Sequence, residues 1–284
     1  MSRTYRATGI NLKSMPMGET DRLLTVLTRE FGLVRIMAMG SRKHNSSLAG
    51  RSSLFVVNDL LIARGRSLDK LTQAETLESY PGLSQDLRKL TASQYLAELC
   101  LYQALSDQPQ EELFCLLNEH LKRLEQSDSA HILPHLTHAV FQLLILAGIA
   151  PQVHVCCISR QPLTPDIHDP DWRIGFSIPS GGTVTLAALE RLKAEKQSRP
   201  GPKVQQPSPL LHTQMTAPEL DLLQRLAQAE LPNLTALEFA DTTHGWRSIE
   251  RVLRYYAQYH LDCPIRSATL VDVCFASPEY PQPS

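Results

Sequence analysis

Basic side chains are concentrated in one short segment of small polar residues, AMGSRKHNSSLAGR, residues 38–51. Arg42, Lys43, His44 and Arg51 lie there among Gly, Ser and Asn residues, and the segment contains no Asp or Glu. Lys and Arg bind a line of phosphates by displacing its counterions. Small neighbours let the backbone approach a phosphate and leave the basic side chains room to move. The segment therefore predicts contact with a polyanion, and a solvated hairpin loop is the alternative.

The first 80 residues carry positive charge that the chain as a whole does not. The chain has 28 Lys and Arg against 29 Asp and Glu, a formal charge of −1. Residues 1–80 contain twelve basic and seven acidic residues, a net charge of +5, so the remainder carries −6. This asymmetry indicates a segment that faces a polyanion, joined to one with other duties. Ordinary surface variation is the alternative.

Five short segments of these 80 residues have the pattern of β-strands, separated by turns that contain Gly or Asn. They are TYRATGINL, DRLLTVLT, LVRIMAMG, LFVVNDLLIAR and LDKLTQAETLE. The second could be a helix on periodicity alone, but Thr25, Val26 and Thr28 favour a strand because branched side chains suit the pleat. Five strands without a helix between them predict a small closed or nearly closed barrel.

A barrel of this kind binds nucleic acid across one sheet face, with loops closing over it. Residues 1–80 contain few aromatic side chains that could form stacking platforms for bases. They are Tyr5, Phe31, Phe55 and Tyr80. We therefore expect binding that is led by the phosphate backbone and indifferent to sequence.

From about residue 83 the apolar period changes to that of helices. Helices are predicted over residues 83–105, 111–126, 133–148, 186–196 and 245–261. In TAPEL, Thr216 and Glu219 have the spacing of a capping box. Residues 151–185 contain short β-like pieces, and residues 198–214, SRPGPKVQQPSPLLHTQ, have the composition of a linker.

Motifs typical of enzymes are absent from the sequence: there is no G-x-S-x-G, P-loop, H-E-x-x-H or G-x-G-x-x-G. His131, His135 and His138 share a helix face, for which hydrogen bonding or solvation is favoured over a metal. We expect no cofactor. Six cysteines without a regular framework indicate reduced cytosolic thiols. No apolar run reaches the roughly 20 residues of a membrane span, and nothing suggests export.

The order of several segments resembles the bacterial RecO family of DNA repair and recombination mediators. They are GINLKSMPMGETDRLLTVLTREFGLVRIMAMGSRKHNSSLAG, LTQAETLE, YLAELC, LFCLLNEHLKRL, LLILAGIAPQV and YYAQYHLDCPIRSATLV. The likeness covers nearly the whole chain and is weakest between about residues 186 and 215. No single segment is diagnostic, but their order and spacing are specific.

The resemblance implies an α+β multidomain fold. An N-terminal five-stranded OB-fold barrel, residues 1–80, would precede an all-helical domain, residues 81–150 and 210–284. A zinc-finger-like insert and linker, residues 151–209, would interrupt that helical domain. The implied protein is not an enzyme, binds no membrane, and is cytoplasmic and nucleoid-associated.

The implied function is to bind single- and double-stranded DNA, anneal complementary strands and help load recombinase onto SSB-coated DNA. Partners would be RecR, the C-terminal tail of SSB and, indirectly, RecA. An RNA-binding barrel protein and a protein-interaction scaffold are the alternatives. The expected DNA-binding residues are Arg42, Lys43 and Arg51, with Arg22, Arg35, Arg64 and Arg66 as neighbours. A basic-rimmed groove for the acidic, apolar-ended SSB tail is expected beside Arg88, Lys89, Lys122 and Arg123.

The chain departs from the family pattern at the metal site. Two Cys-x-x-Cys pairs would fall on Cys156 with Ser159 and on Thr185 with Ala188, so that one position in four is cysteine. Other ligands, from His154, His168 or Cys263, would require a rearranged insert. We therefore predict an insert that has lost its metal ligands, without structural zinc. We expect packing to hold it together, through an apolar cluster of Val153, Trp172, Ile174, Phe176 and Ile178.

Overall fold

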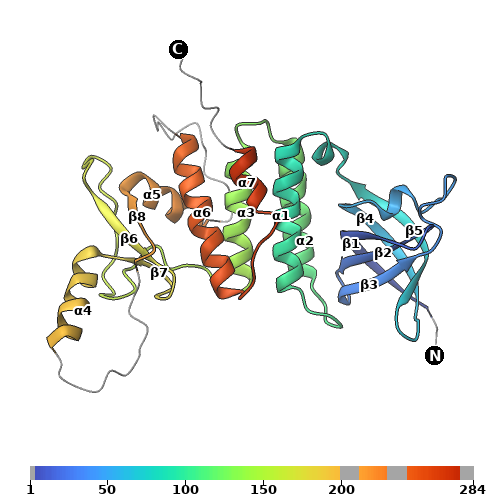
Figure 1. The fold of residues 1–284 in the computed structure, drawn as a ribbon, viewed down its shortest axis with the longest axis horizontal. Helices are drawn as coiled ribbons and strands as arrows, with labels where there is room; N and C mark the ends of the chain where they lie inside the picture. Colours follow the sequence, from blue (N-terminus) through green and yellow to red (C-terminus); the bar gives the residue numbers. More distant parts are fainter. Residues whose placement is uncertain (1–3, 199–210, 229–241, 276–284) are drawn as a thin grey trace, which may run out of the picture. The chain divides into compact units, whose positions relative to one another are not determined.

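The chain forms two compact units in a computed structural model, which describes residues 4–198, 211–228 and 242–275 (Figure 1). One unit comprises Met1–Ala139 with Ile265–Ser284, and the other Val140–Pro264. Helix α3 (Ile132–Leu146) contains the boundary between them. Within the described ranges, no helix is both long enough and apolar enough to span a membrane.

Five strands in the first unit close into a barrel in the order β1-β2-β3-β5-β4 (Figure 1). They are β1 (Thr4–Met17), β2 (Asp21–Thr28), β3 (Gly32–Ala38), β4 (Val56–Ala63) and β5 (Asp69–Ser79). Strands β3 and β5 pair in parallel and all other neighbours pair antiparallel, which is the OB-type arrangement. All five predicted strands are confirmed, and DRLLTVLT is a strand.

The barrel core follows from the two-residue period of its strands. Leu24, Val26, Ile36, Leu60 and Ile62 are fully buried and form one apolar cluster. Residues between them in sequence point outward, because successive side chains of a strand alternate between faces. Each strand therefore offers one row of side chains to the core and another to the outer surface.

Helices of the first unit join the barrel at the β2–β3 turn. The 3₁₀ turn η2 (Pro81–Ser84) leads into α1 (Leu87–Gln103), which α2 (Glu111–Gln126) follows. The start of α3 and helix α7 (Thr269–Cys274) belong to the same unit. Gly32 has φ +64°, and a Cβ there would lie 2.0 Å from the Leu105 carbonyl oxygen. Only glycine fits this approach, which lets the Leu33 N–H donate to that oxygen at 2.9 Å.

Glu98 connects α1 to the residues that precede helix α7. Its carboxylate accepts hydrogen bonds from the Arg266 N–H at 3.0 Å, the Ser267 N–H at 2.8 Å and the Ser267 hydroxyl at 2.6 Å. Burial opposes its ionisation, but these donors lower the pKa of Glu98 below its ordinary value. The carboxylate thus remains ionised and fastens residues that are far apart in the sequence.

The second unit contains a three-stranded sheet, ordered β7-β6-β8, and the remaining helices. Its elements are β6 (Arg173–Ser177), β7 (Gly182–Val184), α4 (Leu186–Ser198), β8 (Thr213–Thr216), α5 (Ala217–Arg225) and α6 (Thr242–His260). The capping box of Thr216 and Glu219 at the start of α5 is confirmed. The predicted linker was wrong at its end: β8 begins at Thr213, which pairs with Phe176 of β6. Residues 199–210 of that stretch lie outside the described ranges.

The predicted histidine face does not provide a single environment. His120 of α2 and His138 of α3 are buried, with ring centroids 5.5 Å apart, whereas the His131 Nδ1 lies 2.6 Å from an Asp128 carboxylate oxygen. Burial and then the neighbouring cationic groups lower the pKa of His120 to about 3 and that of His135 to about 4. Among the residues that the structure describes, no three His, Cys, Asp or Glu side chains could hold a metal.

These histidines predict a loss of stability in mild acid. The folded chain keeps His120 neutral down to a pKa of about 3, whereas the unfolded chain takes up the proton below about 6.5. The free energy of unfolding should therefore fall as the pH falls from 6.5, by about 1–2 kcal/mol at pH 5 from His120 alone. Urea titrations of His120→Gln should show a flatter pH dependence between 7 and 5. The control His44→Gln, in an exposed loop, should match the unaltered chain; equal slopes for all three proteins would contradict the assignment.

Candidate nucleic-acid interface

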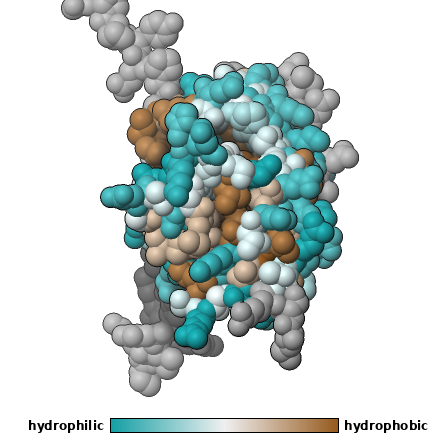
Figure 2. All heavy atoms as spheres, turned by 90° about the vertical axis from the view of Figure 1, so that its right-hand side faces the viewer, coloured by the Kyte–Doolittle hydropathy of each residue, from teal (hydrophilic) through white to brown (hydrophobic). Residues whose placement is uncertain are grey.

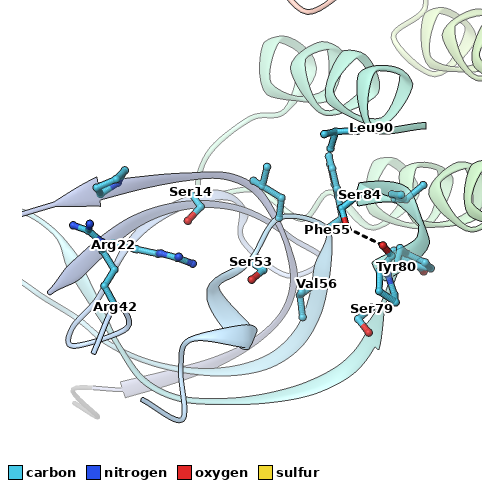
Figure 3. Close-up of a pocket in the computed structure, with 14 residues that line it drawn as sticks. Ser14, Arg22, Arg42, Ser53, Phe55, Val56, Ser79, Tyr80, Ser84 and Leu90 are labelled. Atoms are coloured by element: carbon cyan, nitrogen blue, oxygen red, sulfur yellow. Dashed lines mark hydrogen bonds between the residues drawn. The ribbon is translucent and has the colours of Figure 1, made fainter. Parts of the chain in front are cut away.

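A pocket of about 720 Å³ opens at one end of the barrel, beside the start of the helical region. In Figure 3 the Arg22 and Arg42 side chains lie at one end of it, and Tyr80, Ser84 and Leu90 lie at the other. Ser14 and Ser53 line the space between. The pocket therefore has a cationic end, a hydroxyl-bearing middle and a largely apolar far end. We call this region the barrel mouth.

Strand register brings Arg22 to the barrel mouth. Its neighbours on the same side of β2, Leu24 and Val26, are fully buried in the core. Arg22 lies opposite Ala38 at the end of this inward row, where the barrel opens. Its Nη1 donates to the Ser52 hydroxyl at 3.2 Å and to the Ser52 carbonyl oxygen at 3.4 Å. Both acceptors are neutral, so they orient the guanidinium without cancelling its charge.

The basic segment is a succession of turns attached to the β1–β2 hairpin. The Arg42 N–H donates to the Thr20 carbonyl at 2.8 Å, and the Gly40 N–H donates to the Asp21 carboxylate at 2.7 Å. The Gly40 N–H and then the Thr20 hydroxyl lower the pKa of Asp21, which stays ionised. The Arg42 Nη1 donates to the Gly18 carbonyl at 2.9 Å. The Arg42 guanidinium is therefore also held by a neutral oxygen.

Two buried asparagines anchor the other end of this segment. Asn11 and Asn58 are fully buried, and their side-chain amides donate to the Arg51 carbonyl at 2.8 and 3.0 Å. The Asn11 amide also donates to the Ser53 carbonyl at 2.8 Å. Arg51 thus has a structural role through its backbone, and its half-buried side chain begins at a fixed point of the rim.

The seven predicted DNA-binding residues occupy three regions of the barrel surface. Arg22, Arg42, Lys43 and Arg51 belong to the barrel mouth and its loop. Arg64 and Arg66 lie on the β4–β5 turn, where the Arg64 guanidinium lies 5.4 Å from the centroid of the Tyr5 ring. Arg35 is exposed on the outward face of β3. Within the described residues none of the seven forms an ion pair, although Lys43 is near enough to Asp21 to contribute to the lowered pKa of that carboxyl.

The four residues predicted to bind a partner have different local roles. Lys89 Nζ donates to the Glu125 carbonyl at 2.6 Å and Arg88 Nε to the Cys274 carbonyl at 3.1 Å, so both satisfy helix ends. Arg123 pairs with Glu119 one turn earlier on α2. Lys122 is exposed. The exposed cationic charge of this set is therefore greatest on α2.

The sequence interpretation missed a group of methionines on the outer face of the barrel. Met15 and Met17 of β1 alternate with Ser14 and Pro16, and Met37 and Met39 flank Ala38 at the end of β3. The period of two in SMPMG and IMAMG was the available signal. Figure 2 faces the barrel and shows apolar surface interrupting its hydrophilic side chains.

The four positions of the family metal site lie close together in the insert. The Cys156 sulfur accepts hydrogen bonds from the Ser159 N–H at 3.4 Å and the Thr185 N–H at 3.3 Å, and lies 3.7 Å from the Thr185 hydroxyl. Ala188 packs against Cys156 in the same buried cluster. Burial opposes ionisation of the thiol, but the hydrogen bonds outweigh it and lower the pKa of Cys156 to about 7. The donor set, one thiol with hydroxyls and a methyl group, does not fit zinc.

An apolar cluster surrounds Cys156 in the insert. Val184 and Ala188 are its buried partners, and half-buried Cys157, Ile158 and Leu163 pack against them. Four of the five predicted residues are buried, whereas Trp172 is only partly so. The residues around Cys156, including Ala188 of the second ligand segment, form a further apolar cluster in the insert.

Taken together, a barrel of OB topology with a charged mouth, a helical region and a small β insert defines a multidomain protein of the oligonucleotide-binding-fold class. Family models described as "Recombination protein O N terminal" and "Recombination protein O C terminal" match residues 1–80 and 84–198. The chain belongs to the RecO family of DNA repair proteins, as the resemblance predicted.

Similar full-length proteins support this assignment. The "DNA repair protein RecO" of Nostoc sp. (strain PCC 7120) is 55% identical over 294 residues, covering 98% of each chain. That of Cyanothece sp. (strain PCC 7425) is 56% identical over 291 residues, covering 97% of this chain and 98% of its own. That of Synechococcus elongatus is 44% identical over 274 residues, covering 96% of each.

The geometry of the insert predicts that the protein holds no structural zinc. Elemental analysis of protein purified without chelator should find far less than one zinc per chain. The variant Ser159→Cys with Thr185→Cys and Ala188→Cys should gain one zinc, because the four positions already converge on one point. One zinc per unaltered chain, absent from Cys156→Ser, would contradict the first expectation. A triple variant that binds no zinc would contradict the claim that the four positions lie close enough to bind one ion.

Proposed function

We propose that this protein binds single- and double-stranded DNA without covalent chemistry, anneals complementary strands and helps load recombinase onto SSB-coated DNA. The observation that carries the proposal is the barrel mouth, where Arg22 and Arg42 are held by neutral oxygen atoms. Guanidinium groups oriented in this way remain available to phosphates. In this proposal the barrel, residues 1–80, provides the DNA site and the helical domain, residues 81–150 and 210–284, the partner sites.

Annealing requires no catalytic group. Two complementary strands repel each other through their phosphates, and a cationic surface that contacts both reduces this repulsion. Base pairing then supplies the free energy of the product. A non-enzymatic mediator of this kind would act on DNA with RecR and SSB, and on RecA indirectly, and would work at the nucleoid in the cytoplasm.

The function is tested by an annealing assay on complementary strands already coated with the matching SSB protein. The proposal expects faster annealing than SSB alone allows, and tighter binding to DNA than to RNA of matched sequence. Preferential RNA binding would support an RNA-binding protein, and binding to neither would support a protein-interaction scaffold. Either result would contradict the proposal.

The first variant addresses the basic loop of the barrel mouth. Arg42→Ala with Lys43→Ala should weaken DNA binding to a similar degree across sequences, because phosphate contacts carry no base information. Each phosphate that is no longer bound should flatten the plot of log affinity against log salt by about 0.9 on duplex or about 0.7 on single strands. Arg191→Ala with Lys193→Ala, the same charge change on α4, is the control. An unchanged slope in the loop variant would place the DNA site elsewhere.

We also propose that the helical region binds the C-terminal tail of SSB. An acidic tail with an apolar end needs an apolar groove with a basic rim, and Lys122 and Arg123 are the predicted rim residues on α2. Lys122→Glu with Arg123→Glu should weaken binding of a tail peptide at least about tenfold, since both charges are reversed. The control Arg42→Glu with Lys43→Glu should leave peptide affinity unchanged. Equal losses in the two variants, measured by fluorescence anisotropy, would refute a helical tail site.

A further inference from the structure

Methionine side chains cover an open part of the outward face of β1, β2 and β3. Strand register places Met15, Leu23 and Met37 opposite one another in one row. The next row contains Met17 opposite Asp21, and Met39 directly follows the last residue of β3. Met15, Met17 and Met39 are 44, 40 and 54% exposed. We call the four methionines with Leu23 the methionine face; it holds four of the six methionines of the chain.

The same outward face is buried where the helices begin. Ile10 and Leu27 are opposite each other on this face, nearer the β2–β3 turn, and both are fully buried. Helices α1 and α2 contact β1 there, and α2 also contacts β2. The methionine face is therefore the half of the sheet that the helices of this unit leave open. Exposed apolar area gathered on one sheet face indicates a binding surface rather than scattered surface residues.

Basic side chains border the methionine face. Lys13 and Arg35 lie opposite Thr25 in the adjacent row, and Lys70 of β5 lies opposite Met37. All three basic residues are exposed. At the hairpin end, the Arg42 guanidinium donates to the carbonyl of Gly18, the residue that follows Met17. The methionine face and the barrel mouth therefore adjoin, and basic side chains border the apolar area on three strands and at the loop.

Two acids lie at the hairpin end of this surface, the exposed Glu19 and the half-buried Asp21. The Asp21 carboxylate accepts hydrogen bonds from the Gly40 N–H at 2.7 Å and the Thr20 hydroxyl at 2.8 Å. These hydrogen bonds partly satisfy the Asp21 carboxylate within the hairpin. An apolar centre with a cationic border is complementary to a ligand with apolar faces and an anionic backbone.

The four aromatic side chains of the barrel form no exposed stacking platform, since two are buried and two are partly buried against each other. Phe55 and Tyr80 are 3% and 7% exposed. Tyr5 and Phe31 pack against the core and against each other, with ring centroids 4.9 Å apart. Methionine offers an alternative, since its thioether is polarizable and its unbranched chain adapts to irregular partners.

We propose that the methionine face binds the bases of unpaired DNA, and that Lys13, Arg35, Lys70 and Arg42 hold the adjoining phosphates. This inference rests on the proposed DNA-binding function and assigns the part of the surface that distinguishes single strands from duplex. Unpaired bases expose apolar faces that a double helix conceals by stacking. An apolar surface without hydrogen-bonding side chains at its centre accepts any base, so the contact is indifferent to sequence.

The triple variant Met15→Gln, Met17→Gln and Met39→Gln tests the proposal, because glutamine keeps the side-chain length and removes the apolar contact. Single-strand affinity should fall about fivefold or more, comparable with the loss of one stacked base. Duplex affinity should change less than about twofold, and the salt slope should be unchanged because the phosphates remain bound. Leu77→Gln is the matched control, since Leu77 is 53% exposed on β5 of the same barrel but outside the methionine face.

A second measurement uses the unaltered protein and does not depend on the folding of a variant. Methionine oxidation by dilute peroxide, followed by mass spectrometry, should slow at Met15, Met17 and Met39 when an oligonucleotide of single-stranded DNA is bound. Duplex at equal occupancy should protect them less. Met215, which is 1% exposed in β8, should stay unoxidised throughout, and it reports that the second unit remains folded.

Full single-strand affinity in the triple variant, or equal losses on single strands and duplex, would overturn the proposal. A protein partner on the methionine face would give the first of these results. The proposed function fails separately, because its refutation is read from the unaltered chain, which would then bind RNA in preference to DNA or bind neither. The loop variant Arg42→Ala with Lys43→Ala, measured in parallel, removes phosphate contacts and leaves the methionine face intact, so it should weaken binding to single strands and to duplex alike.

Discussion

The candidate DNA site depends on two guanidinium groups that are oriented by neutral oxygen atoms instead of carboxylates. Ser52 holds Arg22, and the Gly18 carbonyl holds Arg42. A carboxylate would fix either group more strongly but would also cancel its charge. Neutral acceptors retain both position and charge. The loop that carries Arg42 and Ser52 is held by the buried asparagines that bind the Arg51 carbonyl and by the Asp21 carboxylate that binds the Gly40 N–H.

Charge and apolar surface have separate roles in the proposed DNA site of the barrel. Phosphates are common to single strands and duplex, so the barrel mouth contributes affinity for both. Bases are exposed only in single strands, so the methionine face contributes the preference between them. A mediator that anneals strands must release its product, and a surface that binds duplex less tightly than single strands favours release. The two surfaces meet at the β1–β2 hairpin, where Arg42 reaches the residue after Met17.

The strands, most helices and the capping box of Thr216 could be predicted because each has a local signal in periodicity or spacing. Strand β8 could not, since its four residues pair with β6, about 40 positions earlier in the chain. The basic loop was found from composition, but the neutral acceptors that hold Arg22 and Arg42 depend on tertiary contacts. The separation of Arg35, Arg64 and Arg66 from the barrel mouth depends on barrel closure. The methionine face had a signal of period two, which was not used.

The uncompensated charge of the barrel mouth is tested most directly by supplying the missing carboxylate. Ser53 is exposed and lines the pocket, so Ser53→Asp places a negative charge near both guanidinium groups. The control Ser67→Asp makes the same change on the exposed β4–β5 turn. Affinity for single strands and duplex should be measured over a range of salt concentrations. We predict that Ser53→Asp, unlike Ser67→Asp, weakens binding to single strands and to duplex. It should also flatten the salt slope of each, by about 0.7–0.9 for each phosphate that is no longer bound. Slopes and affinities equal to those of Ser67→Asp would contradict this assignment of the DNA site.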